Sequence, residues 1–417
     1  MIEKTRKGLL QYKWELVVLL SISFFFNQAD RQIFNVVLSS IRDDLGLSDA
    51  NMGLIASVFI LVYALMVPVG GLLGDRIKKK HVIVFSLLFW SVSTLLTGLS
   101  FTLIQLIILR SVATGGGESF YAPSANALIC EYHDETRSTA LSIHQAASYL
   151  GVVASGFLTG LIADHFGWRF AFYLFGGFGI ILAAILFVRI KDNPFSNIPD
   201  TQAKKKIRVN ELLKVFFKKP TAILLTLAFA GMIFVNVSFL TWMPTFLHEK
   251  FNFSLSRAGF DSTFYHFLAA FFGVMAGATL ADKLGQRYFG VRGFIQMIGL
   301  YAGAPFIYIL SRSESFLIIY LALTLFGFCR GLYDSNIFAA LYDVIEKPFR
   351  STATGLMLMF AFVVGSSSPY IMGLLKPVLG LSSGMALLSI IYIVSATSIL
   401  IALIFFYKRD RVMPNNY

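Results

Sequence analysis

The chain consists of long apolar runs separated by short polar segments, which carry most of the charged residues. A helix that crosses a bilayer needs about 20 mainly apolar residues, because an α-helix rises about 1.5 Å per residue. Runs of this kind predict spanning helices at 14–40, 51–74, 81–99, 102–130, 138–164, 170–189, 220–248, 258–281, 291–311, 315–345, 352–376 and 383–407. The pattern therefore predicts an all-α membrane protein with twelve transmembrane helices.

The first apolar run follows the basic segment KTRKGLLQYKW and continues through the polar cluster NQADR. A secretory signal would have a short apolar core followed by a cleavage site of small residues. We therefore interpret this run as the first spanning helix.

The composition supports the membrane class. Hydrophobic residues make up 56% of the chain and charged residues 14%, against roughly 25% charged residues in soluble domains. The net charge of +12 could suggest nucleic acid, but the basic residues lie in short loops between apolar runs. The expected partner is the lipid bilayer, and no nucleic acid is expected.

Lys and Arg residues are distributed unequally between the two sets of loops. One side of the predicted membrane carries 26 of them and the other six, while Arg31, Arg110 and Arg330 lie inside spans. Cytoplasmic loops carry the excess of Lys and Arg. We therefore expect a multi-pass protein of the plasma (cytoplasmic) membrane with both termini in the cytoplasm.

Residues 190–219 form the only long polar stretch and are predicted to be a cytoplasmic linker. This linker divides the chain into an N-terminal six-helix bundle (1–189) and a C-terminal one (220–417). Three segments of the first half resemble segments of the second in the same order: 45–53 and 251–259, 70–76 and 277–283, 127–140 and 340–353. Two parallel six-helix repeats are the plan of a transporter whose solute site lies between the halves.

At these loops the chain resembles the major facilitator superfamily over nearly its whole length. The family's loop motif G-x-x-x-D-[RK]-x-G-[RK]-[RK] is matched by Gly71, Asp75, Arg76, Lys79 and Lys80, with Lys78 in place of the inner glycine. The second copy has Gly277, Asp282, Lys283, Gly285 and Arg287. The resemblance implies the major facilitator fold and a gating role for Gly71, Asp75, Arg76, Lys79, Lys80, Asp282, Lys283 and Arg287.

Two branches of that family are most similar. Asp30-Arg31 in the first span, and an arginine followed by a glycine-rich GE pair in the fourth, resemble the spinster-like and the anion:cation symporter branches. The segment TWMPTFL (241–247) resembles the latter branch. The arginine-to-glutamate interval is seven residues in those branches, whereas Arg110 and Glu118 are eight apart. On a regular helix the extra residue turns one side chain by about 100° relative to the other.

Ionisable side chains at membrane depth are candidate functional groups, because each costs about 3 kcal/mol on insertion scales unless it is paired or hydrated. Asp30 and Arg31 are adjacent, so they should face different partners. Glu118 follows three glycines (115–117), which allow close approach of a helix, a ligand or water. We predict that Glu118 carries the coupling proton, and a permanent ion pair with Arg31 or Arg110 is the alternative.

Arg330 and Asp334 are four residues apart in the tenth span, so an internal salt bridge is the simplest interpretation. The alternative is that Arg330 binds the substrate. Polar and aromatic residues in other spans are weaker candidates for substrate contacts, because such residues often hold helices together. They are His144, Gln145, Tyr149, Asn236, Trp242 and Tyr265.

The predicted function is secondary transport by alternating access. Because arginine stays charged and can bind a carboxylate or phosphate through two hydrogen bonds, Arg31, Arg110 and Arg330 predict an anionic solute. A sugar acid or a similar small organic anion is expected, with Asp30, Glu118 and Asp334 as candidates for proton coupling in a symporter. We expect no cofactor and no metal, and a monomer.

Other functions remain open at this stage. The spinster-like resemblance implies a transporter or exporter of lysolipid or another amphiphile. A membrane enzyme, a sensor and a passive channel belong to different classes. The sequence has no metal motif and no nucleophile elbow, and Cys130 and Cys329 lie within apolar runs. The parallel repeat favours transport.

Overall fold

The computed structural model describes residues 2–133, 136–191, 216–285, 288 and 290–412, and all regular structure within these ranges is helical. The chain forms two compact units. The first comprises Met1–Gln202 and Thr241–Thr263, and the second comprises Ala203–Leu240 and Phe264–Tyr417. Most of the predicted linker 190–219 lies outside the described residues, so the domain boundaries stay a prediction.

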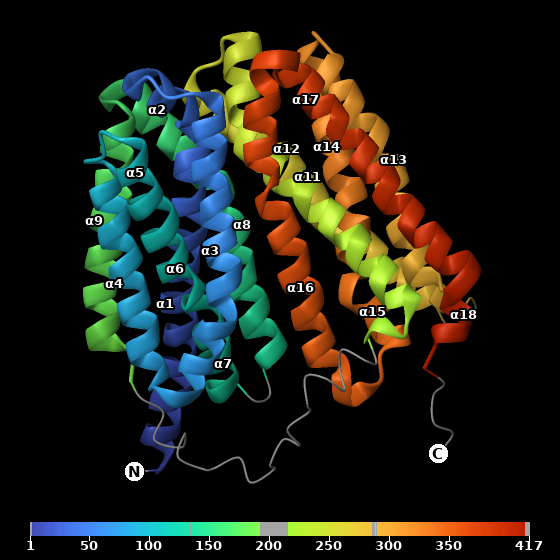
Figure 1. The fold of residues 1–417 in the computed structure, drawn as a ribbon. Helices are drawn as coiled ribbons and strands as arrows, with labels where there is room; N and C mark the ends of the chain where they lie inside the picture. The colour runs from blue at the N-terminus through green and yellow to red at the C-terminus, as the bar shows by residue number, and fades with distance from the viewer. Residues whose placement is uncertain (1, 134–135, 192–215, 286–287, 289, 413–417) are drawn as a thin grey trace. The chain divides into compact units, whose positions relative to one another are not determined.

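The first unit is a helical bundle (Figure 1). α5, the π-helix η1, α6 and α7 follow one path and together form the predicted fourth span. The helices are α1 (Ile2–Val36), α2 (Leu38–Leu45), α3 (Asp49–Arg76), α4 (Lys79–Thr97), α5 (Leu103–Leu106), η1 (Ile107–Ala113), α6 (Thr114–Ser119), α7 (Tyr121–Tyr132), α8 (Arg137–Phe166) and α9 (Trp168–Arg189).

The second unit is also helical. Its first two helices, α11 (Pro220–Phe251) and α12 (Leu255–Gly285), each contribute one end to the first unit. The others are α13 (Val291–Arg312), α14 (Phe316–Asp334), α15 (Ile337–Val344), the 3₁₀-helix η2 (Lys347–Phe349), α16 (Arg350–Ser366), α17 (Ser368–Ile401), the π-helix η3 (Ala402–Phe406) and α18 (Tyr407–Asp410).

The observed helices account for the twelve predicted spans. Within the described residues, nine stretches are long and apolar enough to cross a membrane. One of them, Thr352–Asp410, holds two spans, because Gly380 has φ 74° and ψ 158° and breaks α17. Glycine adopts such a conformation readily because it has no Cβ. The remaining two spans are α1, which carries Asp30 and Arg31, and the path from α5 to α7, which η1 interrupts.

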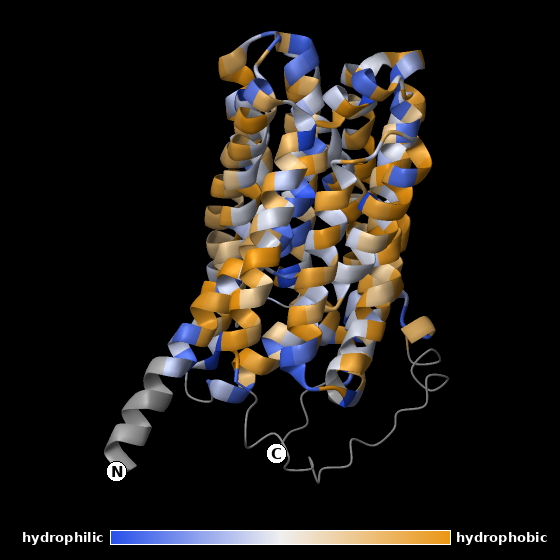
Figure 2. Cartoon of the chain, turned by 90° about the vertical axis from the view of Figure 1, so that its left-hand side faces the viewer, coloured by the Kyte–Doolittle hydropathy of each residue, from blue (hydrophilic) through white to orange (hydrophobic). Residues whose placement is uncertain are grey.

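Large apolar side chains lie on the outside of the helices. Val188, Phe101 and Phe85 are 75%, 67% and 61% exposed. In lipid this exposure is not penalised, because lipid tails are as apolar as the side chains themselves. Figure 2 shows hydrophobic residues along most of the helical length, with hydrophilic residues at the helix ends and along part of the central helices. This distribution is that of a protein embedded in a bilayer.

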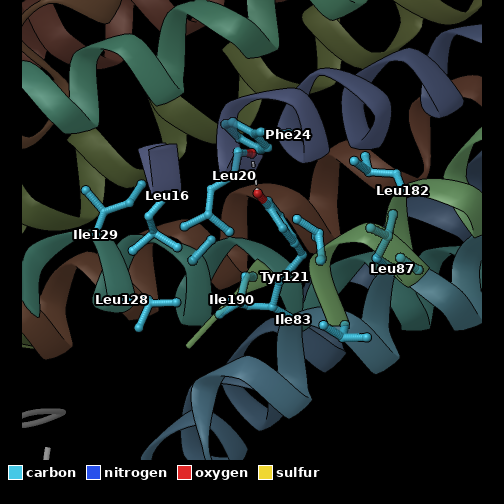
Figure 3. Packing of buried hydrophobic residues seen from close by; sticks show 14 of the residues in the cluster. Leu16, Leu20, Phe24, Ile83, Leu87, Tyr121, Leu128, Ile129, Leu182 and Ile190 are labelled. Atoms are coloured by element: carbon cyan, nitrogen blue, oxygen red, sulfur yellow. Dashed lines mark hydrogen bonds between the residues drawn. The ribbon is translucent and has the colours of Figure 1, made fainter. Parts of the chain in front are cut away.

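The core of the first unit joins α1, α4, α7 and α9 through packed apolar side chains (Figure 3). Tyr121 is fully buried in this cluster, and its hydroxyl donates a hydrogen bond of 2.5 Å to the carbonyl oxygen of Leu20. The bond satisfies a buried polar group and ties the start of α7 to α1. Since Glu118 lies three residues before Tyr121, the same packing fixes the position of its helix.

Within the first unit, α8 packs closely against the start of α12 through small residues. A Cβ on Gly156 would lie 2.5 Å from the carbonyl oxygen of Gly259, and one on Gly160 would overlap the backbone of Leu255 and Ser256. One turn further along α8, Asp164 accepts hydrogen bonds of 3.0 Å from the backbone N–H groups of Leu255 and Ser256. A carboxylate at a helix N-terminus is stabilising there.

We expect Gly160→Leu to separate these two segments, because backbone atoms cannot move aside as a flexible side chain can. Overpacking should lower the free energy of unfolding by about 1–3 kcal/mol. Gly177→Leu is the matched control, since a Cβ there has nothing within 4 Å. The melting temperature in detergent measures the effect, and equal melting temperatures for the two variants would contradict the contact.

Another contact, outside the spans, involves Asp44, at the end of α2. Its carboxylate forms an ion pair with the guanidinium of Arg169 and accepts a hydrogen bond of 3.1 Å from the indole N–H of Trp168. The hydrogen bond from Arg169 lowers the pKa of Asp44, and Trp168 lowers it further. The contact joins α2 to the start of α9.

We expect the stabilisation from Asp44 to depend on pH. Because the folded-state pKa is lowered, the contribution is present above the ordinary Asp pKa of about 3.9 and is lost as pH falls through the folded-state value. The side chain is 46% exposed, so the contribution is at most about 1 kcal/mol. Melting temperatures of Asp44→Asn and the parent between pH 7 and pH 3 should converge at the acid end. In an Arg169→Gln background, Asp44→Asn should have a smaller effect at neutral pH, because only the hydrogen bond from Trp168 remains.

Candidate functional site

The first unit brings together four of the predicted charged residues. Arg31 on α1 forms an ion pair with Glu118 on α6, with 2.6 Å between Arg31 Nε and Glu118 Oε2. The Glu118 side chain is inaccessible, whereas the Arg31 side chain is 25% exposed. The pairing is one of the two alternatives considered for Glu118 from the sequence. It leaves the arginine, rather than the carboxylate, open to a ligand.

The two neighbours of this ion pair have different partners. The carboxylate of Asp30 accepts a hydrogen bond of 2.6 Å from the hydroxyl of Thr94 on α4. Arg110, on η1, donates from Nη2 to the carbonyl oxygens of Arg31 at 3.2 Å and Asp30 at 3.5 Å. Asp30 and Arg110 are only 4% and 3% exposed. Asp30 and Arg31 therefore face different helices, as their adjacency on α1 predicts.

Aromatic rings of α3 complete the cluster. The guanidinium carbon of Arg31 lies 4.0 Å from the ring centroid of Tyr63, and that of Arg110 lies 4.3 Å from the ring centroid of Phe59. Phe59 and Tyr63 are four residues apart, so they share one face of α3. Cation–π contacts of this kind are worth about 0.5–2 kcal/mol. They hold both guanidinium groups while leaving N–H donors for an anion.

The π-helix η1 explains the eight-residue interval between Arg110 and Glu118. It spans Ile107–Ala113 and contains Arg110. A π-helical turn accommodates one residue more than an α-helical turn and is common at functional sites. The extra residue is therefore absorbed within η1, and Arg110 and Glu118 both reach the α1 residues Asp30 and Arg31.

Several polar atoms of the cluster are buried and have no hydrogen-bond partner among the described residues. They are Asp30 Oδ1, Glu118 Oε1, Arg31 Nη2, Arg110 Nε and Arg110 Nη1. Buried polar atoms in proteins are nearly always satisfied, so each such atom needs an explanation. Three of them are cationic donors and two are carboxylate acceptors. An anion and a proton are the chemical species that would satisfy both kinds.

A separate cluster lies in the second unit. Arg330 forms an ion pair with Asp334, with 3.2 Å between Nε and Oδ2, which is the internal salt bridge predicted from their spacing. Arg330 Nη1 also lies 2.8 Å from Nε2 of His266 on α12. Because arginine can only donate, His266 must accept and is therefore neutral, with its proton on Nδ1. His266 is fully buried, and the sequence analysis did not single it out.

The weaker substrate candidates of the first unit have varied surroundings. His144 is buried and stacks on Phe24 with 4.5 Å between ring centroids. Gln145 is exposed and donates to Ser148 at 3.0 Å, Tyr149 is 44% exposed, and Trp242 is fully buried. His144 thus contributes to apolar packing. A role of these residues in substrate binding stays a prediction.

The two remaining substrate candidates belong to the second unit. Tyr265 stacks on Tyr320 with 4.7 Å between ring centroids. Asn236 has a buried side-chain oxygen, Oδ1, with no hydrogen-bond partner among the described residues. Among the described residues, Arg330 contacts Asp334, His266 and Phe267, and neither Tyr265 nor Asn236. Their role in binding also stays a prediction.

The predicted gating residues lie at the ends of α3 and α12 and at the start of α4. Lys79 forms an ion pair of 2.6 Å with Glu131 on α7, and Lys80 lies over the ring of Phe187. Arg76, Asp282 and Lys283 are exposed, and Gly71 has open space beside it. The side chain of Asp75 and the whole of Arg287 lie outside the described residues. The gating role is not tested by these contacts.

No group of three or more His, Cys, Asp or Glu residues within the described ranges could hold a metal ion. The first cluster consists of charged side chains. It can bind an anion at a guanidinium and exchange a proton at a carboxyl group.

Comparison with known proteins agrees with this architecture. Residues 20–369 match the family model of the Major Facilitator Superfamily. The hexuronate transporter of Bacillus subtilis (strain 168) is 26% identical over 90% of this chain and 91% of its own length. Protein spinster homolog 1 of Xenopus tropicalis is 27% identical over 87% of this chain and 72% of its own length.

Among solved structures, a bacterial homologue of the human lysosomal transporter spinster, in an inward-facing and unoccupied conformation, has a TM-score of 0.86. It is 22% identical and covers 97% of this chain and 99% of its own. The fold is thus the predicted one, with twelve transmembrane helices in two parallel six-helix repeats. The chain belongs to the Major Facilitator Superfamily and is a membrane transporter rather than an enzyme.

Proposed function

We propose that this chain is a proton-coupled symporter that moves a small organic anion, such as a sugar acid, by alternating access. The ion pair between Arg31 and Glu118 is the observation on which the proposal rests. The similarity to a hexuronate transporter, over nearly the whole of both chains, supports an acidic sugar as the solute. The charge bias between loops supports the plasma membrane and cytoplasmic termini.

In this proposal the solute and Glu118 compete for Arg31. When Glu118 is ionised, its carboxylate occupies the guanidinium at 2.6 Å. When Glu118 takes up a proton, the attraction is lost, and Arg31 becomes available to the carboxylate of the solute. An arginine binds a carboxylate through two parallel hydrogen bonds. Binding of the anion therefore requires binding of a proton, and the loaded site has the same net charge as the empty one.

Asp30 and Arg110 support this exchange. Asp30 and Glu118 each have a buried carboxyl oxygen without a hydrogen-bond partner among the described residues. A proton shared between them would satisfy the carboxyl oxygens that otherwise have no partner. Arg110 contributes a fixed positive charge beside both carboxyl groups and holds the α1 backbone. These two residues would keep the proton at the site while Arg31 holds the solute.

A second candidate is a lysolipid or another amphiphile with an anionic head group. The similarity to protein spinster homolog 1 supports it. The anionic head would bind Arg31 in the same way, and the rings of Phe59 and Tyr63 would lie beside its chain. The two candidates therefore share the anion-binding residue and differ in the apolar part of the cargo.

A thermal-stability panel distinguishes these cargoes. A ligand that binds only the folded protein raises the melting temperature, and at a given concentration a tighter ligand raises it further. Purified protein would be heated with glucuronate, galacturonate, glucose, lysophosphatidylglycerol and lysophosphatidylcholine. We expect the hexuronates to stabilise the protein and neutral glucose to have no effect. Stabilisation by lysophosphatidylglycerol alone would favour the amphiphile, and stabilisation by glucose would contradict an anion site.

A further inference from the structure

The first unit has an apolar pocket of about 780 Å³. Neither Arg31 nor Glu118 lines it, and the proposed transport mechanism assigns it no role. Its walls come from α3, α4 and the end of α9, and include Leu73, Phe85, Phe89 and Phe187. Gly116, on α6, forms part of its floor. The volume is within the range of small-molecule pockets, which is about 300–1,000 Å³.

The pocket walls are also the outer surface of the spans. Phe85, Phe89 and Phe187 are 61%, 54% and 54% exposed. In a bilayer, exposed apolar side chains on a spanning helix contact lipid chains. A hollow bordered by such side chains is open to an acyl chain from the bilayer, and water would find few hydrogen-bond partners in it.

A lysine lies beside one wall of the pocket. The ammonium group of Lys80 lies 5.2 Å from the centroid of the Phe187 ring, which lines the pocket, and His81 lines it directly. Lys79, next in sequence, is already paired with Glu131 at 2.6 Å. Lys80 thus places a cation where an apolar pocket meets the polar end of the helices. An anionic lipid head group fits this combination, since a Lys near the membrane surface attracts anionic lipid.

We propose that this pocket binds one anionic phospholipid, with an acyl chain in the pocket and the phosphate of its head group at Lys80. The lipid is a bound component of the transporter and not its cargo. The pocket adjoins the transport site, because Gly116 faces the pocket and Glu118, two residues later, forms the ion pair with Arg31. Ser86, on the pocket wall, donates a hydrogen bond of 2.6 Å to the carbonyl oxygen of Gly117. An acyl chain there would support the packing of α4 against α6.

Native mass spectrometry of the delipidated protein in a neutral detergent tests this site. The protein would be titrated with phosphatidylglycerol, with phosphatidylcholine of the same chains, and with palmitate. We expect one phosphatidylglycerol to bind about fivefold to tenfold more tightly than phosphatidylcholine, given the contribution of one Lys. Lys80→Glu should remove this preference, while Lys218→Glu, an exposed basic residue of the second unit, should retain it.

A second variant tests the pocket itself. Gly116→Leu adds a side chain to a residue that lines the pocket, where a Cβ would have only Val62 within 4 Å, at 3.8 Å. We expect it to weaken the binding of phosphatidylglycerol at least tenfold, while Gly177→Leu, where a Cβ has open space, leaves binding unchanged. Equal binding of the two phospholipids, or an unaltered preference in Lys80→Glu, would overturn the proposal. Binding of palmitate as tight as that of phosphatidylglycerol would overturn the assignment to a phospholipid. Because these readouts are lipid binding, they are independent of the solute.

Discussion

Glu118→Gln should abolish proton-driven accumulation of the solute and spare exchange of solute for solute. Glutamine cannot ionise, so it resembles the protonated glutamate and leaves Arg31 permanently available to the anion. Exchange requires only that a loaded transporter reorient, whereas net uptake requires that the proton leave. For one proton per solute, a pH difference of one unit supports about tenfold accumulation. We expect this ratio to fall to about one in the variant.

Proteoliposomes with an imposed pH gradient measure both activities on the same preparation. Glu15→Gln is the matched control, because Glu15 pairs with Arg189 in an exposed ion pair on α1, outside the cluster. It should accumulate solute as the parent does. Accumulation by Glu118→Gln at the parent level would contradict the coupling role. If the variant lost both exchange and accumulation, the result would indicate that Glu118 only holds the helices together.

Arg110→Met should destabilise the protein more than any single replacement outside the cluster. It removes one of the two cations beside Asp30 and Glu118, and it leaves the carbonyl oxygens of Asp30 and Arg31 without this donor. Removing one partner from a buried set of charges costs about 3–5 kcal/mol, because the remaining charge is buried without compensation. Adding Asp30→Asn removes that charge. The double variant should therefore regain part of the lost stability, although it should not transport.

Thermal or denaturant unfolding in detergent gives the four free energies of this cycle. We expect a coupling of about 1–3 kcal/mol between Arg110 and Asp30, in the range found for residues of one charged network. Arg312→Met is the control, since Arg312 is exposed at the end of α13. It should change stability by no more than about 0.5 kcal/mol. Additive losses in the Arg110→Met/Asp30→Asn double variant would show that the two side chains do not form one network.

Much of the fold follows from the pattern of apolar runs and loop charges. Long runs interrupted by glycine and charged loops predict the spans, and the break at Gly380 lies between the eleventh and twelfth predicted runs. The charged residues of the cluster can also be predicted from the sequence, because a charged side chain inside a membrane is costly and is rare unless it has a function. The identity of Glu118 as the partner of Arg31 required coordinates, because the sequence leaves Arg31 and Arg110 equally available.

Some residues of the two clusters could not be predicted, because their sequence patterns are also common in residues that only pack helices together. Tyr63 forms a cation–π contact with Arg31, and Phe59 forms one with Arg110. Aromatic residues on a spanning helix, however, usually face lipid or pack against other helices. The eight-residue interval between Arg110 and Glu118 indicates one extra residue in this span, but only the structure shows that the π-helix η1 accommodates it. His266 is a single histidine in an apolar run, and such residues are as common in packing as in binding. It contacts a charged side chain, Arg330, whereas His144 stacks on Phe24 and lies 3.3 Å from the hydroxyl of Tyr121.

In the proposed mechanism the anion and the proton bind together, because the anion and the carboxylate of Glu118 compete for Arg31. Proton uptake by purified protein measures this most directly. By linkage, if protonation of Glu118 raises the affinity for the anion by some factor, binding of the anion raises the affinity of Glu118 for a proton by the same factor. In weakly buffered detergent solution with a pH indicator, addition of the stabilising anion should cause uptake of about one proton per bound anion. Glu118→Gln should bind the anion with no uptake. Anion binding by the parent protein without proton uptake, or equal uptake by Glu118→Gln, would contradict the mechanism.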